Sequence, residues 1–309
     1  MNRSAPRSID QYLTALREEL AGEDTALVQD ALYDAEEYLR AEVAAHPDKS
    51  ESDVLELIAS TYGAPDEVAN AYRDTEAKVK AAMTTPRKVA KTGIGAFFGV
   101  FQDPRAYTSL FFMLLSLATG IIYFTVAVTG LALSAGLGVL IIGVPFFLLF
   151  MGLTRVLALA EGRLIEAMTG ERMPRRPVHQ SSVAGFWSRV GQMLKDRRTW
   201  TTLAYLILML PLGIIYFVMA VVGLSISLAF IFAPLTDVAS RYEWFGIPPD
   251  VRMNPAWLGS VWALPLMVLA GIVLLTLLLH LARGVGRLHA LYAKALLVPS
   301  ASAAIVANP

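Results

Sequence analysis

The chain has 309 residues, of which 55% are hydrophobic and only 17% are charged, and its formal net charge is zero. Soluble globular domains carry fewer apolar residues and about 25% charged ones, so this composition argues against a soluble protein and favours one that spans a membrane. Cysteine is absent, which excludes disulfides and thiolate chemistry from the chain.

Apolar residues recur at helical spacing over residues 8–75, which predicts a compact unit of about four helices. Residues that favour helix N-termini precede three of these helices: Ser8, Asp24 and Ser50. Residues 1–85 hold 18 acidic residues against 8 basic ones and contain no apolar run. We therefore expect an acidic cytosolic head with no secretory signal. Direct nucleic-acid binding is not expected, because it would need clustered Lys and Arg.

Three carboxylates fall on one face of the second predicted helix: Asp30, Asp34 and Glu37. Such a group could bind a divalent cation, but no fourth ligand lies nearby in the sequence. A solvated acidic face is the simpler interpretation. We keep these three residues as candidates for binding a protein partner, and we expect no metal site.

The segments SIDQYLTALREEL, ALYDAEEYLR and YGAPDEVANAYRD occur in this order in the head. They resemble the HAAS signalling domain, a bacterial helical module that precedes membrane spans and is associated with PadR-like transcription regulators. The matching positions are Tyr12, Leu13, Leu16, Leu20, Asp30, Glu37, Leu39, Gly63, Pro65, Val68, Ala69 and Tyr72. The resemblance covers about 70 residues and implies signalling through protein contact, without an active site.

Three stretches without Asp, Glu, Lys or Arg follow the head: residues 106–154, 199–236 and 253–282. A spanning helix needs about 20 apolar residues, so the first stretch holds two spans and the others one each. Small residues at 134–138 suit a turn between the first two. The predicted spans are 109–133, 137–157, 202–232 and 258–281.

Basic residues gather before the first span, in the segment 155–201 and after the last span, whereas the loop 236–257 has only two. Positive charge in short loops marks the cytoplasmic side of a membrane. We therefore predict a multi-pass protein of the bacterial cytoplasmic (inner) membrane. Both termini are expected in the cytosol and the loop 236–257 outside.

The membrane part contains an internal duplication. Residues 103–136 align with 196–229 without a gap, and 16 of the 34 positions are identical. Further on, TRVLALAEGRLIEAM aligns with ARGVGRLHALYAKAL at an offset of 128, which leaves an insertion near 230–264 in the second copy. We predict two tandem two-span repeats in the same orientation, related by a pseudo-twofold axis along the membrane normal.

A short amphipathic stretch follows each second span, at residues 155–170 and 283–298. Both stretches are expected to lie along the inner membrane surface. The predicted fold class is all-α, a small cytosolic helical domain plus a polytopic α-helical membrane domain. The predicted parts are the head 1–85, a basic linker 86–102, repeat one 103–170, a cytosolic connector 171–195, repeat two 196–298 and a tail 299–309.

Both repeats start with D-x-R-x-[YW], contain G-I-I-Y-F and end in an Arg-rich helix after the second span. In these features they resemble the bacterial membrane domain called the putative sensor domain, usually found ahead of histidine kinases in actinobacteria. The likeness covers about 103–170 and 196–298. Two copies are present, one carries an insertion and no kinase follows, so the signal is expected to leave through the head or another subunit.

The predicted outside loop mixes aromatic and charged residues and suits a small ligand or a lipid headgroup. Its candidate residues are Arg241, Tyr242, Glu243, Trp244, Asp250 and Arg252. Tyr123 and Tyr216 recur in mid-span and could line a ligand cleft between the repeats. The alternatives are interfacial anchoring for the loop aromatics and helix packing for the two tyrosines.

No P-loop, H-E-x-x-H motif or nucleophile elbow occurs, the predicted spans contain no carboxylates, and the four histidines form no pair at metal-ligand spacing. We expect no enzyme activity and no cofactor. The favoured function is a membrane sensor that relays an envelope, lipid or small-molecule state to a cytosolic PadR-like regulator or kinase. The alternatives are a transport accessory subunit or small permease and, with less support, a lipid enzyme. Homo-oligomerisation is left open.

Overall fold

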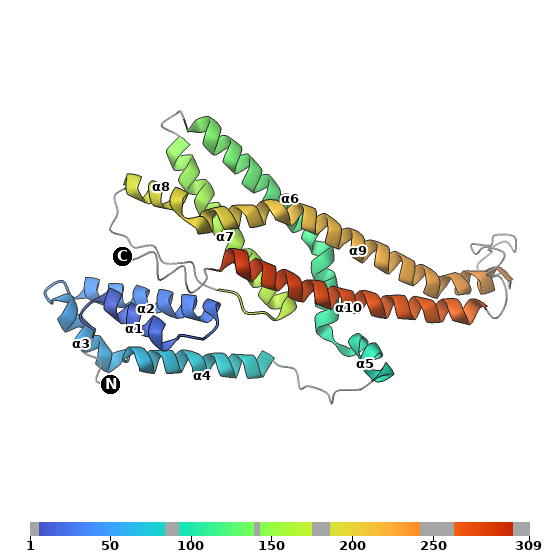
Figure 1. Ribbon diagram of the computed structural model, residues 1–309, viewed down its shortest axis with the longest axis horizontal. Helices are drawn as coiled ribbons and strands as arrows, with labels where there is room; N and C mark the ends of the chain where they lie inside the picture. Colours follow the sequence, from blue (N-terminus) through green and yellow to red (C-terminus); the bar gives the residue numbers. More distant parts are fainter. Residues whose placement is uncertain (1–5, 84–92, 139–142, 175–185, 242–262, 299–309) are drawn as a thin grey trace. The chain divides into compact units, whose positions relative to one another are not determined.

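The computed structural model describes residues 6–83, 93–138, 143–174, 186–241 and 263–298 (Figure 1). Every regular element in these ranges is helical, which confirms the predicted all-α class. In chain order the elements are α1 (Ile9–Glu19), α2 (Thr25–Ala45), α3 (Glu51–Thr61), α4 (Pro65–Met83), α5 (Ile94–Phe98), the 3₁₀ helix η1 (Gly99–Gln102), α6 (Pro104–Leu137), α7 (Gly143–Thr169), α8 (Phe186–Lys195), α9 (Arg197–Arg241) and α10 (Ala263–Leu297).

These helices form two compact units. One unit contains α1 to α4, α7, α8, the first residues of α9 and the last residues of α10. The other contains α5, η1, nearly all of α6, and most of α9 and α10. The long helices α9 and α10 therefore contribute residues to both units.

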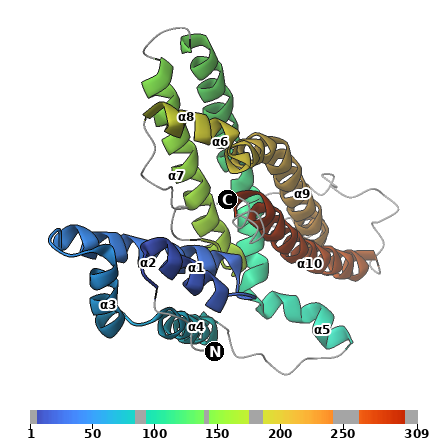
Figure 2. The ribbon, with the colours of Figure 1, turned by 60° about the vertical axis from the view of Figure 1, so that its left-hand side comes forward.

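The head, α1 to α4, is built around an apolar core in which α1 packs against both α2 and α4 (Figure 2). Leu16 of α1, Leu20 directly after α1 and Leu39 of α2 are fully buried there. Burying a leucine side chain contributes about 1.5–3 kcal/mol, so these three positions supply much of the drive for the head to fold. Other buried members of this core are Ile9, Tyr12, Leu27, Ala31, Ala35, Val54, Leu55, Ile58, Val68 and Ala69.

The predicted N-caps of the head are confirmed. The side chains of Ser8, Asp24 and Ser50 each accept a hydrogen bond from a backbone N–H in the first turn of the helix that follows. Each bond satisfies a backbone donor that a helix start leaves without a partner. Gly63, between α3 and α4, has a φ of 106° and its carbonyl accepts a hydrogen bond from the Tyr12 hydroxyl at 2.8 Å. This bond fastens α1 to the α3–α4 connection.

Four helices are long and apolar enough to cross a membrane: α6, α7, α9 over Arg197–Ala239, and α10. Their number agrees with the predicted four spans. The predicted spans 109–133 and 202–232 lie within α6 and α9, whereas 137–157 and 258–281 begin before α7 and α10. The stretches 155–170 and 283–298 are not separate helices, because α7 continues to Thr169 and α10 to Leu297 without a break. Their expected place along the inner membrane surface stays a prediction. Ala, Leu, Glu and Arg, all good helix formers, make up much of both stretches, so nothing in them ends the helix.

Glycines let α6 and α9 approach closely within the second unit. A Cβ atom built on Gly120 of α6 would lie 2.7 Å from the carbonyl oxygen of Met209. A Cβ atom on Gly213 of α9 would collide with the carbonyl oxygen of Ser116. These two contacts are equivalent under the 93-residue offset of the repeats, since Gly120 aligns with Gly213 and Ser116 with Met209. The helices α6 and α9 therefore cross at a point of local twofold pseudosymmetry.

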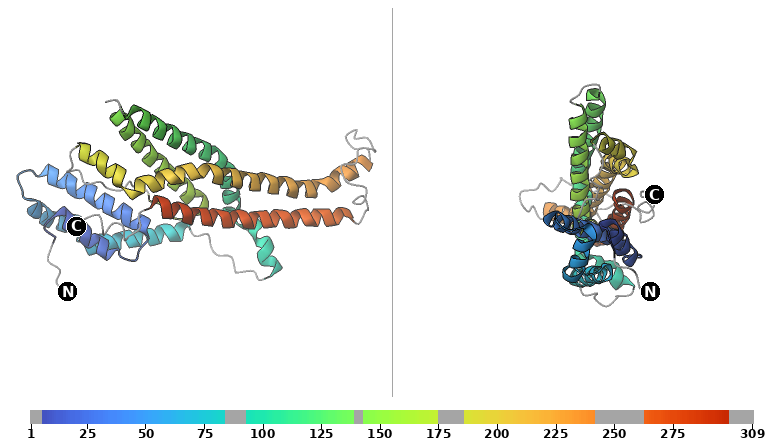
Figure 3. Two further views of the ribbon diagram at one scale, coloured as in Figure 1. Left: turned by 45° about the horizontal axis from the view of Figure 1, so that its top comes forward. Right: turned by 90° about the vertical axis from the view of Figure 1, so that its left-hand side faces the viewer.

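The helices α9 and α10 run side by side over much of their length (Figure 3). Gly223 of α9 faces Leu278 of α10, and Gly271 of α10 faces the backbone of Ile231 and Ser227. Small residues at such contacts allow the close van der Waals packing on which helix association in lipid depends.

The two copies also begin with the same hydrogen bonds. The carboxylates of Asp103 and Asp196 cap α6 and α9, each accepting from the N–H two residues on, at 3.0 and 2.9 Å. The Tyr107 hydroxyl donates to the carbonyl of residue 101 at 3.0 Å, and the indole N–H of Trp200, the aligned residue, donates to the carbonyl of residue 194 at 2.8 Å. The local structure thus repeats with the sequence, while the predicted domain boundaries stay predictions.

Candidate functional site

One guanidinium joins the head to the end of α7. Arg172 Nη2 lies 3.1 Å from Asp30 Oδ2 on α2, and Arg172 Nη1 pairs with Glu76 Oε2 on α4. The side chain of Arg172 is 15% exposed and that of Asp30 7%. The interpretation of Asp30 as part of a solvated acidic face therefore does not hold. Buried charges require partners, and here two carboxylates from different helices share one cation.

The other two predicted partner-binding residues lie in different surroundings. Asp34 accepts a hydrogen bond from the Tyr72 hydroxyl at 2.9 Å, which joins α2 to α4. Burial, together with that bond and the negative charge of Asp34, raises the pKa of Tyr72 above its ordinary value. Glu37 is exposed. Thus Asp30 and Asp34 have partners within the chain, and Glu37 is the one of the three that faces outward.

A second cation contacts the head from the end of α10. Lys294 Nζ donates to Asp24 Oδ2 at 2.5 Å, while Oδ1 of the same carboxylate caps α2. In the repeat alignment α7 and α10 correspond, so the second span of each copy leads to a cation that pairs with a head carboxylate. Arg172 lies just beyond its helix and Lys294 in the last turn of its helix.

The segment that carries Arg172 is held against α7. The helix ends at Gly170, which has a φ of 76°, a conformation that favours glycine. The residue after Arg172 is Met173, whose side chain is buried. A Cβ atom placed on Gly162 of α7 would lie 3.4 Å from the Cβ atom of Met173. Arg172 is therefore fixed between a helix end and an anchored methionine.

A second polar cluster is buried in the other unit around His289 of α10, which is 1% exposed. Its Nε2 lies 3.0 Å from the hydroxyl of Tyr205, and its Nδ1 lies 3.4 Å from the hydroxyl of Tyr216, both on α9. The ring of Phe112 on α6 lies 4.8 Å from the imidazole, centroid to centroid. A neutral imidazole has one donor and one acceptor nitrogen, so the two tyrosines satisfy it in complementary roles.

Repeat-equivalent positions meet at this cluster. Phe112 of the first copy aligns with Tyr205 of the second, and both contact His289. His289 itself aligns with Glu161 of α7, which is also completely buried. Charged residues surround Glu161 in the second half of α7, where Arg155, Arg163 and Glu166 also lie. The absence of intramembrane carboxylates therefore stays a prediction. Burial of an ionisable side chain is costly, so Glu161 and His289 each mark a candidate functional position.

A third histidine contact involves His280 of α10. Its Nε2 lies 3.0 Å from the carbonyl oxygen of Phe97 on α5, and its ring stacks on that phenyl ring at 5.6 Å. Both residues belong to the second unit. His280 thus joins α10 to the short helix that precedes α6.

The predicted ligand residues are only partly described. Arg241 ends α9, and the rest of the predicted outside loop, Tyr242, Glu243, Trp244, Asp250 and Arg252, lies outside the described residues. Tyr123 is buried in α6, and Tyr216 is half-buried beside His289. A role in ligand binding stays a prediction for both tyrosines.

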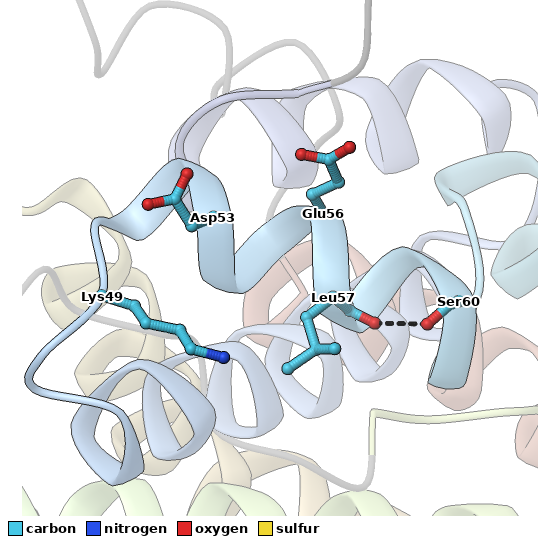
Figure 4. Close-up of a pocket in the computed structure, with 5 residues that line it drawn as sticks. All are labelled: Lys49, Asp53, Glu56, Leu57 and Ser60. Carbon is cyan, nitrogen blue, oxygen red and sulfur yellow. Dashed lines mark hydrogen bonds between the residues drawn. The ribbon is translucent and has the colours of Figure 1, made fainter.

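A shallow hollow lies on the outer face of α3 (Figure 4). Its lining comes from this one helix and the residue before its cap: Lys49, Asp53, Glu56, Leu57 and Ser60. The Ser60 hydroxyl donates to the Leu57 carbonyl at 2.7 Å, as is common within a helix. Among the described residues, no group of three His, Asp or Glu side chains is arranged to hold a metal ion.

The described elements are all helical, and four of the helices are long and apolar enough to cross a membrane. These features define the class as an all-α, multi-pass membrane protein. A family model described as "Putative sensor" matches residues 112–297, more than half of the chain. The chain therefore belongs to the putative sensor family, as its repeated G-I-I-Y-F segments predict. No curated protein and no solved structure matches it. The likeness of the head to the HAAS domain stays a prediction.

Four functional candidates were missed from the sequence. Arg172 and Glu76 gave no signal, because their partners lie far away along the chain and both residues are ordinary for polar segments. Glu161 and His289 carried a weak signal, since the 128-residue offset aligns these two ionisable residues. The alignment alone does not show that they are buried, because other charged residues lie in both stretches.

Proposed function

We propose that this protein is a sensor of the bacterial cytoplasmic membrane. The membrane helices respond to an envelope, lipid or small-molecule state, and the acidic head passes the response to a cytosolic protein, a PadR-like regulator or a kinase. The protein acts by contact and not by catalysis. In this proposal both termini face the cytosol, as the distribution of basic residues predicts.

The observation that carries this proposal is the pair of ionic contacts on the head. Arg172 follows α7 and Lys294 ends α10, and both pair with carboxylates of the head. In each repeat, the helix that contains the second span therefore leads directly to a contact with the head. A shift at the inner end of either helix changes the surroundings of Asp24 or Asp30 without any intervening element.

A signal of this kind needs two arrangements of the spans. A stimulus shifts the balance between them only if it binds or stabilises one arrangement better than the other. A 10-fold difference in affinity corresponds to about 1.4 kcal/mol, which lies between about 0–1 kcal/mol for an exposed ion pair and the roughly 3–5 kcal/mol lost when a buried pair is broken. Loss or gain of the Arg172 or Lys294 contact therefore falls in the range that can report the state of the membrane helices.

The first test is affinity purification of the full-length protein from its native cells, beside a variant that lacks residues 1–85. Bound proteins are identified by mass spectrometry. A regulator or kinase is expected with the full-length protein and not with the truncated one. The double variant Arg172→Gln/Lys294→Gln keeps the whole head and should retain the same partner in every growth condition, because its ionic contacts to the spans are gone.

Two results would overturn the proposal. One is a full-length protein that retains no cellular protein in any condition, and the other is a set of partners that the head deletion leaves unchanged. Solute flux in proteoliposomes containing the purified protein would instead favour the permease alternative, which the parallel repeats motivate.

A further inference from the structure

We infer that Asp30 and Glu76 form a binding site for one guanidinium group, that Arg172 fills this site within the chain, and that the cytosolic partner displaces Arg172 with an arginine of its own. This inference rests on the proposed function and deepens it. It assigns the partner-binding surface of the head to a defined pair of carboxylates. It also states the chemistry of the partner, which carries an arginine that can enter the site between them.

The geometry of the site selects arginine. Two different nitrogens of Arg172 reach two carboxylates that belong to separate helices, α2 and α4. A planar guanidinium offers such a fork, whereas a lysine ammonium acts as a single point charge. The contrast is visible on the same head, where Lys294 meets only the carboxylate of Asp24.

The present occupant is incompletely satisfied. Arg172 Nε is buried and has no hydrogen-bond partner in the part of the chain that the structure describes. An unpaired buried donor weakens the binding of the group that carries it. A guanidinium that enters from another protein, with freedom to orient all its donors, can therefore compete with Arg172 despite the covalent link of Arg172 to the site.

An empty site is unfavourable. Asp30 is buried, and removal of Arg172 would take a compensating cation away from a charge in a poorly solvated place, which is costly. The head therefore exchanges one cation for another and does not simply open. Occupancy by Arg172 and occupancy by a partner exclude each other, so the carboxylate pair can switch the head between a closed and a partner-bound state.

The position of α7 determines whether Arg172 or the arginine of the partner occupies the site. Arg172 lies between Gly170, where α7 ends, and Met173, whose buried side chain packs along Gly162. Movement of the inner end of α7 therefore carries the guanidinium with it. An arrangement of the spans that withdraws this end lowers the local concentration of Arg172 at the site and gives the partner access.

The test uses a capped peptide of residues 168–174, Met-Thr-Gly-Glu-Arg-Met-Pro, as the probe and the full-length protein in detergent or nanodiscs as the receptor. The Arg172→Gln protein should bind the labelled peptide at least 10-fold more tightly than the wild type, whose site is filled. Adding Asp30→Asn to Arg172→Gln should abolish this gain. A peptide with Gln in place of its arginine should not bind, and one with Lys should bind more weakly.

The matched control is Lys294→Gln, which removes a cation from a different head carboxylate and should leave peptide binding at the wild-type level. If Arg172→Gln yields no folded protein, Arg172→Lys takes its place and should give a smaller gain of the same sign. Equal binding by wild type and Arg172→Gln, or a gain that survives Asp30→Asn, would overturn the inference.

The outcomes separate the site from the proposed function. Peptide binding as expected, with no cellular protein retained by the head, would refute the relay and keep the guanidinium site. Unchanged peptide binding, together with a partner lost on deletion of residues 1–85, would refute the site and keep the relay.

Discussion

The head and the membrane helices of the second unit bury different kinds of residue. The head buries leucines and keeps most of its carboxylates outside. The second unit exposes large apolar side chains such as Ile215 and Leu266, and it buries glycine contacts and the His289 cluster. Water drives the first arrangement through the hydrophobic effect. In lipid that effect gives no preference between helices, so close packing and internal hydrogen bonds hold the second arrangement.

The largest loss of stability is expected from a substitution at the point where the backbones of α6 and α9 touch. In Gly213→Leu the new side chain meets the backbone carbonyl of Ser116, which cannot move without shifting α6. We expect loss of folded protein, or a destabilisation of about 3 kcal/mol or more, because overpacking at a rigid contact has no cheap relaxation. Size-exclusion chromatography and thermal unfolding in detergent measure it.

The matched control is Gly152→Leu, on an exposed face of α7 where nothing lies within 4 Å of the new Cβ. It should elute and melt like the wild type. Equal damage from both substitutions would mean that leucine disturbs any position in these helices, and that the α6–α9 crossing is not special.

The head should lose most from a cavity. Leu39→Ala removes a fully buried side chain from α2, and we expect a loss of about 2–5 kcal/mol. Hydrogen exchange of head peptides in the full-length protein reports it locally. Leu57→Ala, at a position 46% exposed, should change the stability by no more than about 0.5 kcal/mol. Similar exchange rates in the two variants would contradict a head held by its apolar core.

An intermediate effect is expected at the buried histidine. Tyr205→Phe removes the hydroxyl that meets His289 Nε2 and leaves a buried nitrogen without that partner, which costs about 1–3 kcal/mol. The midpoint of thermal unfolding in detergent should fall. Tyr107→Phe removes an exposed hydroxyl that donates to the carbonyl of Phe101, and it should have little effect. A smaller loss at Tyr205 than at Tyr107 would show that the cluster does not stabilise the unit.

The smallest effect is expected from an exposed ion pair. Arg283 Nη1 lies 3.1 Å from Asp103 Oδ2, but the Arg283 side chain is 46% exposed. Arg283→Gln should therefore cost about 0–1 kcal/mol, and the difference from the wild type should shrink as salt is added. Thermal unfolding at low and high ionic strength measures it. A loss larger than that of Tyr205→Phe would reverse the order proposed here for this unit.

Features that depend on a few neighbouring residues could be predicted from the sequence. Helical spacing, apolar runs and capping residues act over a few positions, so the head helices, their caps and four apolar helices were predictable. The ends of α7 and α10 were not, because an amphipathic pattern is compatible both with a surface helix and with the continuation of a span. The candidate site was harder still, since Asp30 was chosen for its exposed charge and is in fact buried.

The sequence by itself determined the helical class, the membrane-spanning lengths, the duplication and the family, because each depends on local composition or on comparison of one segment with another. Only the tertiary structure decided that Arg172 meets Asp30 across 142 positions, that Gly120 and Gly213 meet aligned partners, and that His289 is enclosed by two tyrosines. Such contacts depend on how helices pack in space. Residue spacing along a chain does not specify that packing, because many arrangements bury the same apolar faces.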